Sequence, residues 1–367
     1  VLRVVNGDFA QRPATRQREL QLRTYTVVPL SASEGIAEWV SDSMSLGDWL
    51  VGGKKGGGAH ARYRPADFLH SEVMKAMEEF TGKTKQDKDK AQQGEKKLAE
   101  QREKRRETFE NCCAFFNPVL HLFFSERFPS GPDWHRARSK YCRSVAASSV
   151  LGYVLGLGDR HLNNILLDTV TGEIVHIDFG ILLSQGKTLK IPEKVPCRLT
   201  RDIVAGLGAL GVEGSFRRQS EIAMEALRDQ NLKGLLVAIA EVFVCDPLAS
   251  DTASLRVLRR QEGDECEEGG RTQQKGRRGM GGPSPSVSER GGAARHGGRN
   301  WTWTSGSGGQ NESARWALRE MESKLSGFFE ISDATPLDVA SQVDRLILSA
   351  RDPENLAAMY FGWSPWV

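Results

Sequence analysis

Several patterns are missing from this chain of 367 residues, and each absence excludes a class of protein. No stretch approaches the run of about 18 apolar residues that a transmembrane helix needs. The six cysteines show no Cys-x-x-Cys spacing and no dense disulfide pattern, so we interpret them as reduced thiols of an intracellular protein. Neither H-E-x-x-H nor G-x-S-x-G occurs, and no Cys/His cluster has zinc-like spacing, which excludes the hydrolases that depend on those motifs.

A strong excess of charge of one sign is also missing. With 50 basic and 47 acidic residues the formal net charge is +3, so we expect no direct sequence-specific binding of nucleic acid and no membrane association. Residues 83–107 are mostly charged with little apolar face, which indicates a solvated helix or a disordered insertion. Residues 249–312 are rich in Gly, Ser, Arg and Gln, and we predict a disordered linker there.

One combination of residues does carry chemistry. Residues 156–168 read GLGDRHLNNILLD and residues 176–180 read HIDFG, so Asp159, Asn164 and Asp178 follow one another between buried hydrophobic segments. Phosphoryl transfer needs a carboxylate that orients a hydroxyl nucleophile, and hard oxygen ligands for Mg²⁺. Protein kinases place these groups in H-R-D-x-x-x-x-N and D-F-G. Each element alone is explained better by a turn-capping Asp, a buried Asn or a chance D-F-G, but all three in order favour a phosphotransferase.

This interpretation gives each residue a role. Asp159 would accept the proton of the attacking hydroxyl, and Asn164 and Asp178 would hold the metal. His follows the Asp in this chain, in the order D-R-H-x-x-N, so His161 would lie near the transferred phosphoryl group and offset its charge. Two competing motifs are weaker. GLGALG at 206–211 has no buried strand before it and reads as a turn between helices, and GGKKGGG at 52–58 lacks the G-K-[S/T] of a Walker A loop.

Hydrophobic periodicity and turn residues predict a mainly helical chain with a few short strands. The expected strands are 24–30, 35–40, and two around NILLD and EIVHID, joined by a turn at 169–172. The expected helices are 71–110, 109–128 with a break at Pro118, 139–157, several within 200–246, 313–329, and 336–350 with Val339, Val343, Leu346 and Ile347 on one face.

D-R-H-x-x-N followed by HIDFG resembles the phosphatidylinositol 3-kinase-related protein kinases. Three further stretches are similar to that family: YTVVPLSASEGIAEWV, VPCRLTRDIVAGLGALGVEGSFRR and the terminal LILSARDPENLAAMYFGWSPWV, which resembles the FATC tail. The resemblance implies an α+β, two-lobed kinase fold. The implied parts are an N-lobe remnant and hinge (1–40), a C-lobe (41–248) with catalytic loop (156–168) and activation loop (178–200), the linker (249–312), a helix before FATC (313–334) and FATC (335–367).

The same resemblance implies ATP and Mg²⁺ as cofactors and protein substrates phosphorylated at Ser/Thr-Gln sites. It also implies a nuclear role in DNA-damage signalling, with DNA-damage sensor proteins as partners and homodimers formed by the full-length protein. The backbone of Glu38 and Val40 would bind the adenine edge and Trp39 would pack on the ring. Without the downstream motifs, an ordinary strand end with a core Trp would explain these three residues better.

One kinase feature is missing. A kinase needs a lysine on a strand before the hinge, yet residues 1–38 contain no lysine and no glycine-rich loop, and the first lysine is Lys54. We therefore expect either a fragment or truncated gene model of a kinase, or a degenerate kinase acting as a scaffold remnant. A phosphoinositide kinase shares D-R-H-x-x-N and D-F-G, but the FATC-like tail argues against it.

Two more expectations concern the end of the chain. Met359, Tyr360, Phe361, Trp363 and Trp366 are too apolar to leave in water, so we expect the tail to pack on the kinase core. The alternative is an exposed motif for a lipid interface or a partner. In the linker, Thr272 precedes Gln273, which makes Thr272 a candidate autophosphorylation site, although an incidental Thr-Gln pair explains it as well.

Overall fold

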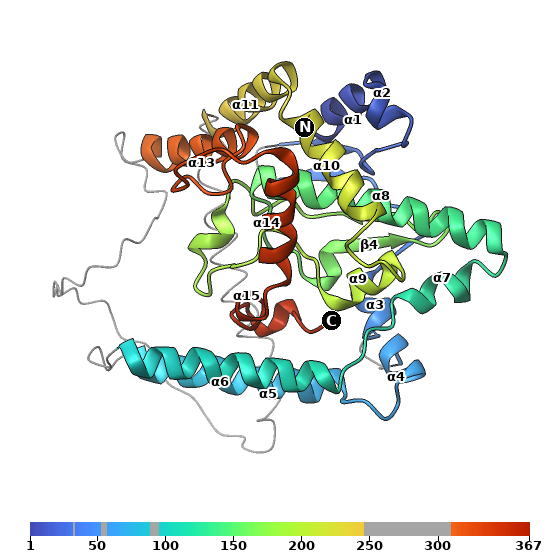
Figure 1. The fold of residues 1–367 in the computed structure, drawn as a ribbon, viewed down its shortest axis with the longest axis vertical. Helices are drawn as coiled ribbons and strands as arrows, with labels where there is room; N and C mark the ends of the chain where they lie inside the picture. Colours follow the sequence, from blue (N-terminus) through green and yellow to red (C-terminus); the bar gives the residue numbers. More distant parts are fainter. Residues whose placement is uncertain (32–33, 53–56, 89–94, 246–309) are drawn as a thin grey trace, which may run out of the picture.

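The computed structural model describes residues 1–31, 34–52, 57–88, 95–245 and 310–367 (Figure 1). Its helices are α1 (Leu2–Gln11), α2 (Pro13–Arg16), α3 (Leu46–Leu50), α4 (Ala59–Tyr63), α5 (His70–Lys88), α6 (Glu95–Ala114), α7 (His121–Arg127), α8 (Gly131–Leu155), α9 (Arg201–Leu207), α10 (Ser215–Leu227), α11 (Gln230–Cys245), α13 (Gln310–Leu325), α14 (Val339–Arg351) and α15 (Pro353–Ala357). Its strands are β1 (Val27–Pro29), β2 (Gly35–Ala37), β3 (Ser43–Ser45), β4 (Ile165–Asp168) and β5 (Ile174–His176), and its 3₁₀ turns are η1 (Leu162–Asn164), η2 (Gln185–Thr188) and η3 (Phe361–Trp363).

A small antiparallel sheet in the order β3-β4-β5 carries the segment with the candidate catalytic residues. The predicted strands around NILLD and EIVHID are confirmed as β4 and β5, and β3 adds to the far edge of β4. The turn between β4 and β5 forms because Asp168 accepts hydrogen bonds from the N–H groups of Val170 (2.9 Å) and Thr171 (2.8 Å). Such Asx turns are local, which explains why the sequence predicted this one.

Helix α8 runs through the centre of the fold beside this sheet (Figure 1). The Ser130 hydroxyl caps its amino end by accepting from the Asp133 N–H at 3.3 Å, and Pro132 occupies the first turn, where a missing N–H is tolerated. Gly156 ends the helix in the left-handed conformation (φ 58°), which glycine adopts without a steric penalty. The carboxyl-terminal half of α8 is almost entirely buried because α9, α10 and β5 pack around it.

Two predicted helix boundaries are confirmed. Helix α6 ends at Ala114, before Pro118, and α7 begins after it, as expected for a residue that cannot continue a helix. The GLGALG stretch is the turn between α9 and α10, where Gly208 (φ 98°) and Gly211 (φ 54°) adopt conformations that other residues avoid. It carries no nucleotide-binding strand before it, in agreement with the sequence.

The charged segment has a structural role that its composition did not indicate. Helices α5 and α6 lie side by side along one edge of the molecule, and α6 packs against α15 in the carboxyl-terminal segment (Figure 1). Arg105 of α6, mostly buried, donates a hydrogen bond to the Met359 carbonyl oxygen at 2.9 Å. Of the two interpretations of 83–107, the solvated helix is confirmed for the described part of α6, whose side chains are mostly exposed, but one of its faces also supports the tail.

The carboxyl-terminal tail is packed, as predicted from its aromatic cluster. Met359, Trp363 and Trp366 are buried, and Tyr360 is the more exposed member. Arg198, itself buried, donates to the carbonyl oxygens of the last residues and lies over a tail ring. Its contacts are Trp363 O (2.7 Å), Ser364 O (2.9 Å), Val367 O (3.1 Å) and the Trp363 ring (4.1 Å from the centroid). These bonds satisfy backbone groups that would otherwise be buried without partners.

The amino-terminal region divides into a packed helix and an exposed hairpin. Helix α1 buries Val5 and Phe9 and lies against α10. The antiparallel pair β1–β2 is exposed at all of its residues, including Val27 and Ile36, and forms a separate two-stranded sheet. The predicted strand at 24–30 is thus correct in type, but it is not buried.

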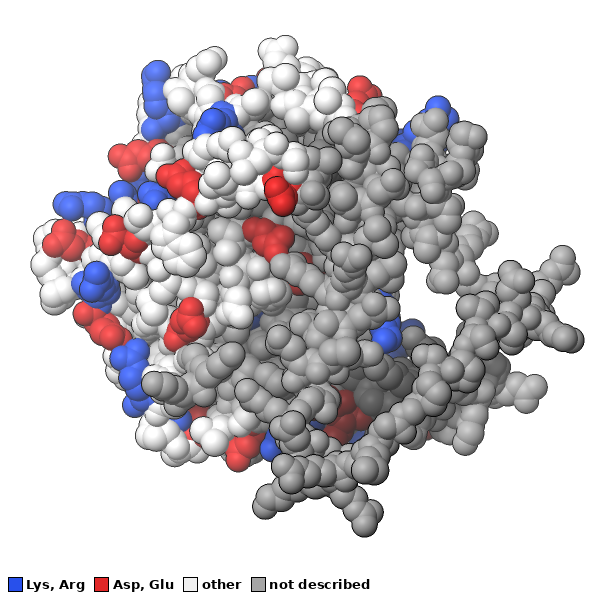
Figure 2. Space-filling model, turned by 180° about the vertical axis from the view of Figure 1, so that it is seen from behind, with Lys and Arg blue, Asp and Glu red and all other residues white. Residues whose placement is uncertain are grey.

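These elements agree with the predicted α+β class, with a mostly helical body, a small sheet and a helical carboxyl-terminal segment. The predicted linker falls mostly on 246–309, outside the described residues, as does Thr272; α13 begins at Gln310, within the last residues assigned to that linker. Lysine, arginine and acidic side chains are interspersed over the described part of the face in Figure 2. No helix in the described ranges is long and apolar enough to cross a membrane.

Candidate active site

The candidate metal ligands meet at one end of the β4–β5 pair. In this ladder Ile165 lies opposite His176, and the Ile177 N–H donates to the Asn164 carbonyl oxygen at 3.1 Å. The antiparallel register therefore brings Asn164 and Asp178 to the same end of the sheet, although the turn at 169–172 separates them along the chain.

Asn164 is joined directly to the candidate base. Its buried side-chain amide donates from Nδ2 to the Asp159 carbonyl oxygen at 2.8 Å and reaches the Asp159 carboxylate at 3.4 Å. Asp159 and Asn164, which are five residues apart in the sequence, are thus in direct contact across the 3₁₀ turn η1. All three predicted groups, Asp159, Asn164 and Asp178, lie on connected backbone segments.

Asp159 and Asp178 share an unusual backbone conformation. Both have positive φ angles, 56° and 55°. Residues other than glycine adopt this left-handed region at a cost, which Asp and Asn bear more easily than most, and such residues concentrate at functional sites.

Arg160, between the candidate base and His161, holds the two motifs together. Its buried guanidinium donates to the carbonyl oxygens of Gly158 (Nε, 2.8 Å) and Ile177 (2.7 Å), and also to that of Asp178. Burial lowers the pKa of Arg160, while the neighbouring carboxylates oppose this shift. The Arg of the D-R-H triplet therefore ties the catalytic loop to the D-F-G segment.

Backbone hydrogen bonds strengthen this connection. Ile181 O accepts from the Gly158 N–H (2.9 Å), and the N–H groups of Leu183 and Ser184 donate to Leu155 O (2.8 Å) and Gly156 O (3.0 Å). A Cβ on Gly156 would lie only 2.3 Å from the Ser184 nitrogen, so the close approach of the two segments requires glycine there.

His161 lies at the amino end of η1. Its Nδ1 accepts a hydrogen bond from the Asn163 N–H at 3.2 Å, so in the neutral ring the proton is assigned to Nε2. The side chain is half-buried. The Nδ1 side of the ring is thus held by the backbone, and the Nε2–H on the other side is a hydrogen-bond donor.

The predicted hinge residues follow the second strand of the exposed hairpin, directly after β2. Glu38 donates its N–H to Thr26 O (2.8 Å) and accepts the Thr26 N–H on its carboxylate (2.8 Å). Val40 O accepts from the Ser43 hydroxyl at 2.6 Å, just before β3 joins the sheet. Trp39 is 86% exposed, so the alternative of a core Trp is wrong.

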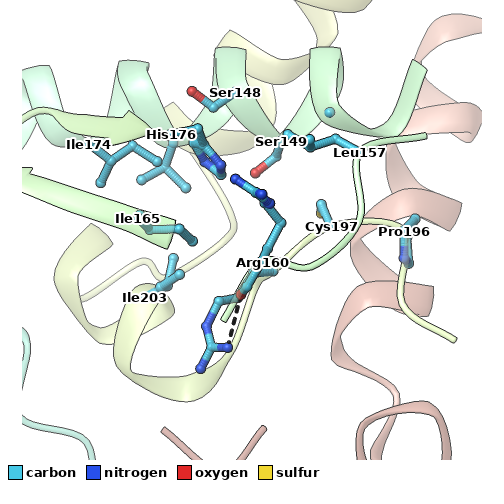
Figure 3. A pocket seen from close by; sticks show the side chains of 13 residues that line it. Ser148, Ser149, Leu157, Arg160, Ile165, Ile174, His176, Pro196, Cys197 and Ile203 are labelled. Atoms are coloured by element: carbon cyan, nitrogen blue, oxygen red, sulfur yellow. Dashed lines mark hydrogen bonds between the residues drawn. The ribbon is translucent and has the colours of Figure 1, made fainter. Parts of the chain in front are cut away.

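A small cavity lies beneath the catalytic loop (Figure 3). Arg160, Ser149 and His176 point toward one another in it, and its volume is about 10 Å³, close to the space of one water molecule. Burial, and then the charge of Arg160, lower the pKa of His176 to about 3, so this imidazole is neutral at physiological pH. The cavity is far too small for a nucleotide.

Sequence reasoning missed two residues of the site. Arg160 was visible within D-R-H but received no role, and Glu193 carried no local signal at all. Glu193 comes from the segment between η2 and α9, and its carboxylate accepts the Asp159 N–H at 2.7 Å. Burial, opposed by this hydrogen bond, raises the pKa of Glu193 to about 7.

The donor set fits Mg²⁺ in chemistry. Asn164 and Asp178 offer an amide and a carboxylate oxygen, the hard ligands that this ion prefers alongside phosphate and water. Within the described residues, no group of three or more His, Cys, Asp or Glu is placed to hold a metal ion.

Comparison with known families agrees with this geometry. The profile for phosphatidylinositol 3- and 4-kinases matches residues 1–250, and the FATC domain profile matches residues 336–367. The chain belongs to the phosphatidylinositol 3- and 4-kinase family. The expected resemblance to the phosphatidylinositol 3-kinase-related protein kinases is confirmed, and with it the fold class.

Curated relatives place the chain near the ATM and Tel1 kinases. It is 38% identical to the serine-protein kinase ATM of Sus scrofa over all of this chain and 11% of that protein. It is 36% identical to ATM of Arabidopsis thaliana (99% of this chain, 8% of that one) and to tel1 of Schizosaccharomyces pombe (99% and 11%). The chain therefore spans about a tenth of the length of these relatives.

Solved structures give the same result. A structure described as the FAT and kinase domain of CtTel1 matches with a TM-score of 0.72 and 32% identity, covering 100% of this chain and 20% of that one. A CtTel1 dimer with C2 symmetry matches equally well over 11% of its chain. The relatives matched over the whole chain are thus ATM and Tel1 kinases, which agrees with the resemblance of residues 195–218 and of the last residues to that branch of the family.

Proposed function

We propose that this chain is the catalytic portion of an ATM-like serine/threonine protein kinase. It would transfer the γ-phosphoryl group of ATP to Ser or Thr followed by Gln, in nuclear DNA-damage signalling. The observation that carries the proposal is the contact of Asn164 with Asp159 beside Asp178, in a chain whose relatives are serine/threonine kinases.

Asp159 would accept the proton of the substrate hydroxyl. Its backbone is held by Asn164 at the carbonyl oxygen and by Glu193 at the N–H, so its carboxylate leaves the loop in one direction. The attacking hydroxyl requires a carboxylate in a fixed position, because phosphoryl transfer depends mainly on positioning and charge.

Asn164 and Asp178 would hold the metal. Since Asn164 Nδ2 donates to Asp159, its Oδ1 is the atom left for a cation. Bound Mg²⁺ would neutralise charge on the phosphates. Arg160 keeps Asp178 in place through the Asp178 carbonyl oxygen, so both ligands are fixed by the same buried guanidinium and the same β-ladder.

His161 and the hinge would complete nucleotide binding. The Nε2–H of His161 would donate to an oxygen of the transferred phosphoryl group. At the hinge the Glu38 N–H is already used by Thr26, so its carbonyl oxygen and the Val40 N–H would meet the adenine edge. The exposed Trp39 ring would cover the base.

The proposed partners are protein substrates and DNA-damage sensor proteins. One matched structure is described as a complete CtTel1 dimer with C2 symmetry and another as a Tel1 kinase butterfly symmetric dimer. We extend this to the full-length form of the present protein, which we propose to be a homodimer. The predicted domain boundaries belong to the same proposal.

The test replaces Asp159, Asn164 and Asp178 separately by Ala in the full-length protein. Each change is expected to lower kcat for a Ser-Gln peptide more than about tenfold, which corresponds to about 1.4 kcal/mol of transition-state stabilisation. Glu225→Ala, which removes an exposed carboxylate of α10, is the control and should leave kcat unchanged.

A variant of this set that keeps more than about a tenth of wild-type kcat would show that its role is misassigned. The same enzyme is offered phosphatidylinositol vesicles in parallel. Phosphorylation of the lipid but not of the peptide would favour the phosphoinositide kinase. Inactivity on both substrates, with normal folding, would favour a scaffold.

A further inference from the structure

A second carboxylate lies against the backbone of Asp159. Glu193 Oε1 accepts the Asp159 N–H at 2.7 Å, and the Glu193 N–H donates to Gly186 O at 3.0 Å. Glu193 belongs to the predicted activation loop, so this contact joins that loop to the residue that would take the hydroxyl proton.

The neighbouring residues leave room for this carboxylate. A Cβ on Gly186 would lie 2.1 Å from Glu193 Oε2, and a Cβ on Gly158 would lie 2.5 Å from the same atom. Neither glycine is among the described residues with a positive φ angle. A side chain at either position would therefore collide with the Glu193 carboxylate, which lies between the two glycines. The reason for glycine at both positions is this lack of room and not the backbone conformation.

Asp159 needs such support because its own conformation is strained. With φ at 56° it would relax toward the ordinary regions unless its peptide groups were held. Asn164 holds its carbonyl oxygen and Glu193 holds its N–H, from opposite sides of the residue.

We propose that Glu193 is a positioning residue of the phosphotransfer reaction, which holds Asp159 in the conformation that presents its carboxylate to the substrate hydroxyl. The inference rests on the proposed role of Asp159. It makes catalysis depend on the folded state of the segment between η2 and α9, because Glu193 reaches Asp159 only while its own N–H is bonded to Gly186.

The experiment compares Glu193→Ala, Glu193→Gln and Gly186→Ala in the full-length protein, with Asp159→Ala as reference. Rates are measured against a Ser-Gln peptide while ATP and peptide are varied. Glu193→Ala should lower kcat about tenfold or more with little change in KM for ATP, since nucleotide contacts are untouched. Glu193→Gln keeps an oxygen acceptor and should recover most of kcat.

Gly186→Ala tests the seating of the carboxylate without removing it. The added methyl group should displace Glu193 and lower kcat by a similar factor. In the double variant with Glu193→Ala the methyl group has room, so the second change should cost little more than the first. If Glu193→Ala does not fold, Glu193→Gln and Gly186→Ala decide the question.

Three outcomes would overturn the inference. They are wild-type kcat in Glu193→Ala while Asp159→Ala is inactive, equal losses in Glu193→Ala and Glu193→Gln, and wild-type kcat in Gly186→Ala. Activity retained in Asp159→Ala would instead reject the proposed function, so the two failures are distinguishable.

Discussion

The exposed hairpin and the carboxyl-terminal tail both contain apolar and aromatic residues, but these side chains are exposed in the hairpin and buried in the tail. Trp39, just after β2, is 86% exposed, whereas Trp366 in the tail is completely buried. The hairpin's hydrogen bonds are mostly its own, such as those between Thr26 and Glu38. The tail is held by α5, α6 and the buried Arg198.

The difference shows what makes an aromatic cluster structural. The indole of Trp366 lies 5.4 Å from the His70 ring, and its carbonyl oxygen is 3.4 Å from Arg201. The tail thus meets a surface that supplies both apolar contact and donors for its backbone. The hairpin has apolar side chains but no such surface within the described residues, so burial follows from the partner and not from composition.

The largest expected effect concerns the hairpin. Residues 1–367 expressed alone should bind ATP weakly and show no kinase activity, because no lysine precedes the hinge to contact the phosphates. Loss of one preorganised contact of this kind costs on the order of 10²–10³ in rate. The uncovered strands should also cause aggregation. Isothermal titration with ATP, a peptide assay and light scattering measure these three properties.

A matched pair of variants sharpens this prediction. Val27→Thr and Ile36→Thr remove exposed apolar groups while keeping β propensity, and should improve solubility without restoring activity. Robust Mg²⁺-dependent phosphorylation by the purified chain, abolished by Asp159→Ala, would contradict the predicted inactivity of residues 1–367.

The next largest effect compares the two tryptophans directly. Trp366→Ala should lower the free energy of unfolding by about 3–5 kcal/mol, because a fully buried ring leaves a cavity. Trp39→Ala should change it by about 0.5 kcal/mol or less, because the ring is in water. Denaturant unfolding of the full-length protein, followed by hydrogen exchange at residues 356–367, measures both. Equal losses of unfolding free energy in the two variants would contradict the stated difference between the hairpin and the tail.

The smallest effect is a pH dependence at the contact between His70 of α5 and the tail. Burial, with the charges of His60 and Arg198, lowers the pKa of His70 to about 4 from 6.5. The unfolded state therefore binds more protons between these values, so the stability from neutral His70 is present above pH 6.5 and is lost as pH falls toward 4. At pH 5 the expected loss is on the order of 2 kcal/mol.

His70→Gln tests the source of this loss. Glutamine can still hydrogen-bond to the Ser364 hydroxyl, which lies 3.1 Å from His70 Nε2, but it does not titrate. The melting temperature of this variant should therefore fall less between pH 7 and pH 5 than that of the wild type. His176, whose pKa is also lowered, is present in both proteins and contributes equally. An unchanged pH dependence would contradict the assignment to His70.

Local signals were sufficient for much of the fold. The turn after β4 and the break at Pro118 depend on side chains within a few residues, so the sequence predicted them. The same is true of the offset between Asp159 and Asn164. The role of α6 was missed because its composition is polar, and the contact of Arg105 with Met359 depends on a segment far along the chain.

The sequence alone was enough to predict the chemistry of the candidate site, because oxygen ligands and a base in kinase order are readable as residue types and spacings. It also determined the family and the packing of an aromatic tail. Only the tertiary structure decided what holds these groups, since Arg160, Glu193 and Arg198 act through carbonyl oxygens and N–H groups of distant segments. Backbone groups carry no sequence signature, so contacts to them become visible only when the chain is folded.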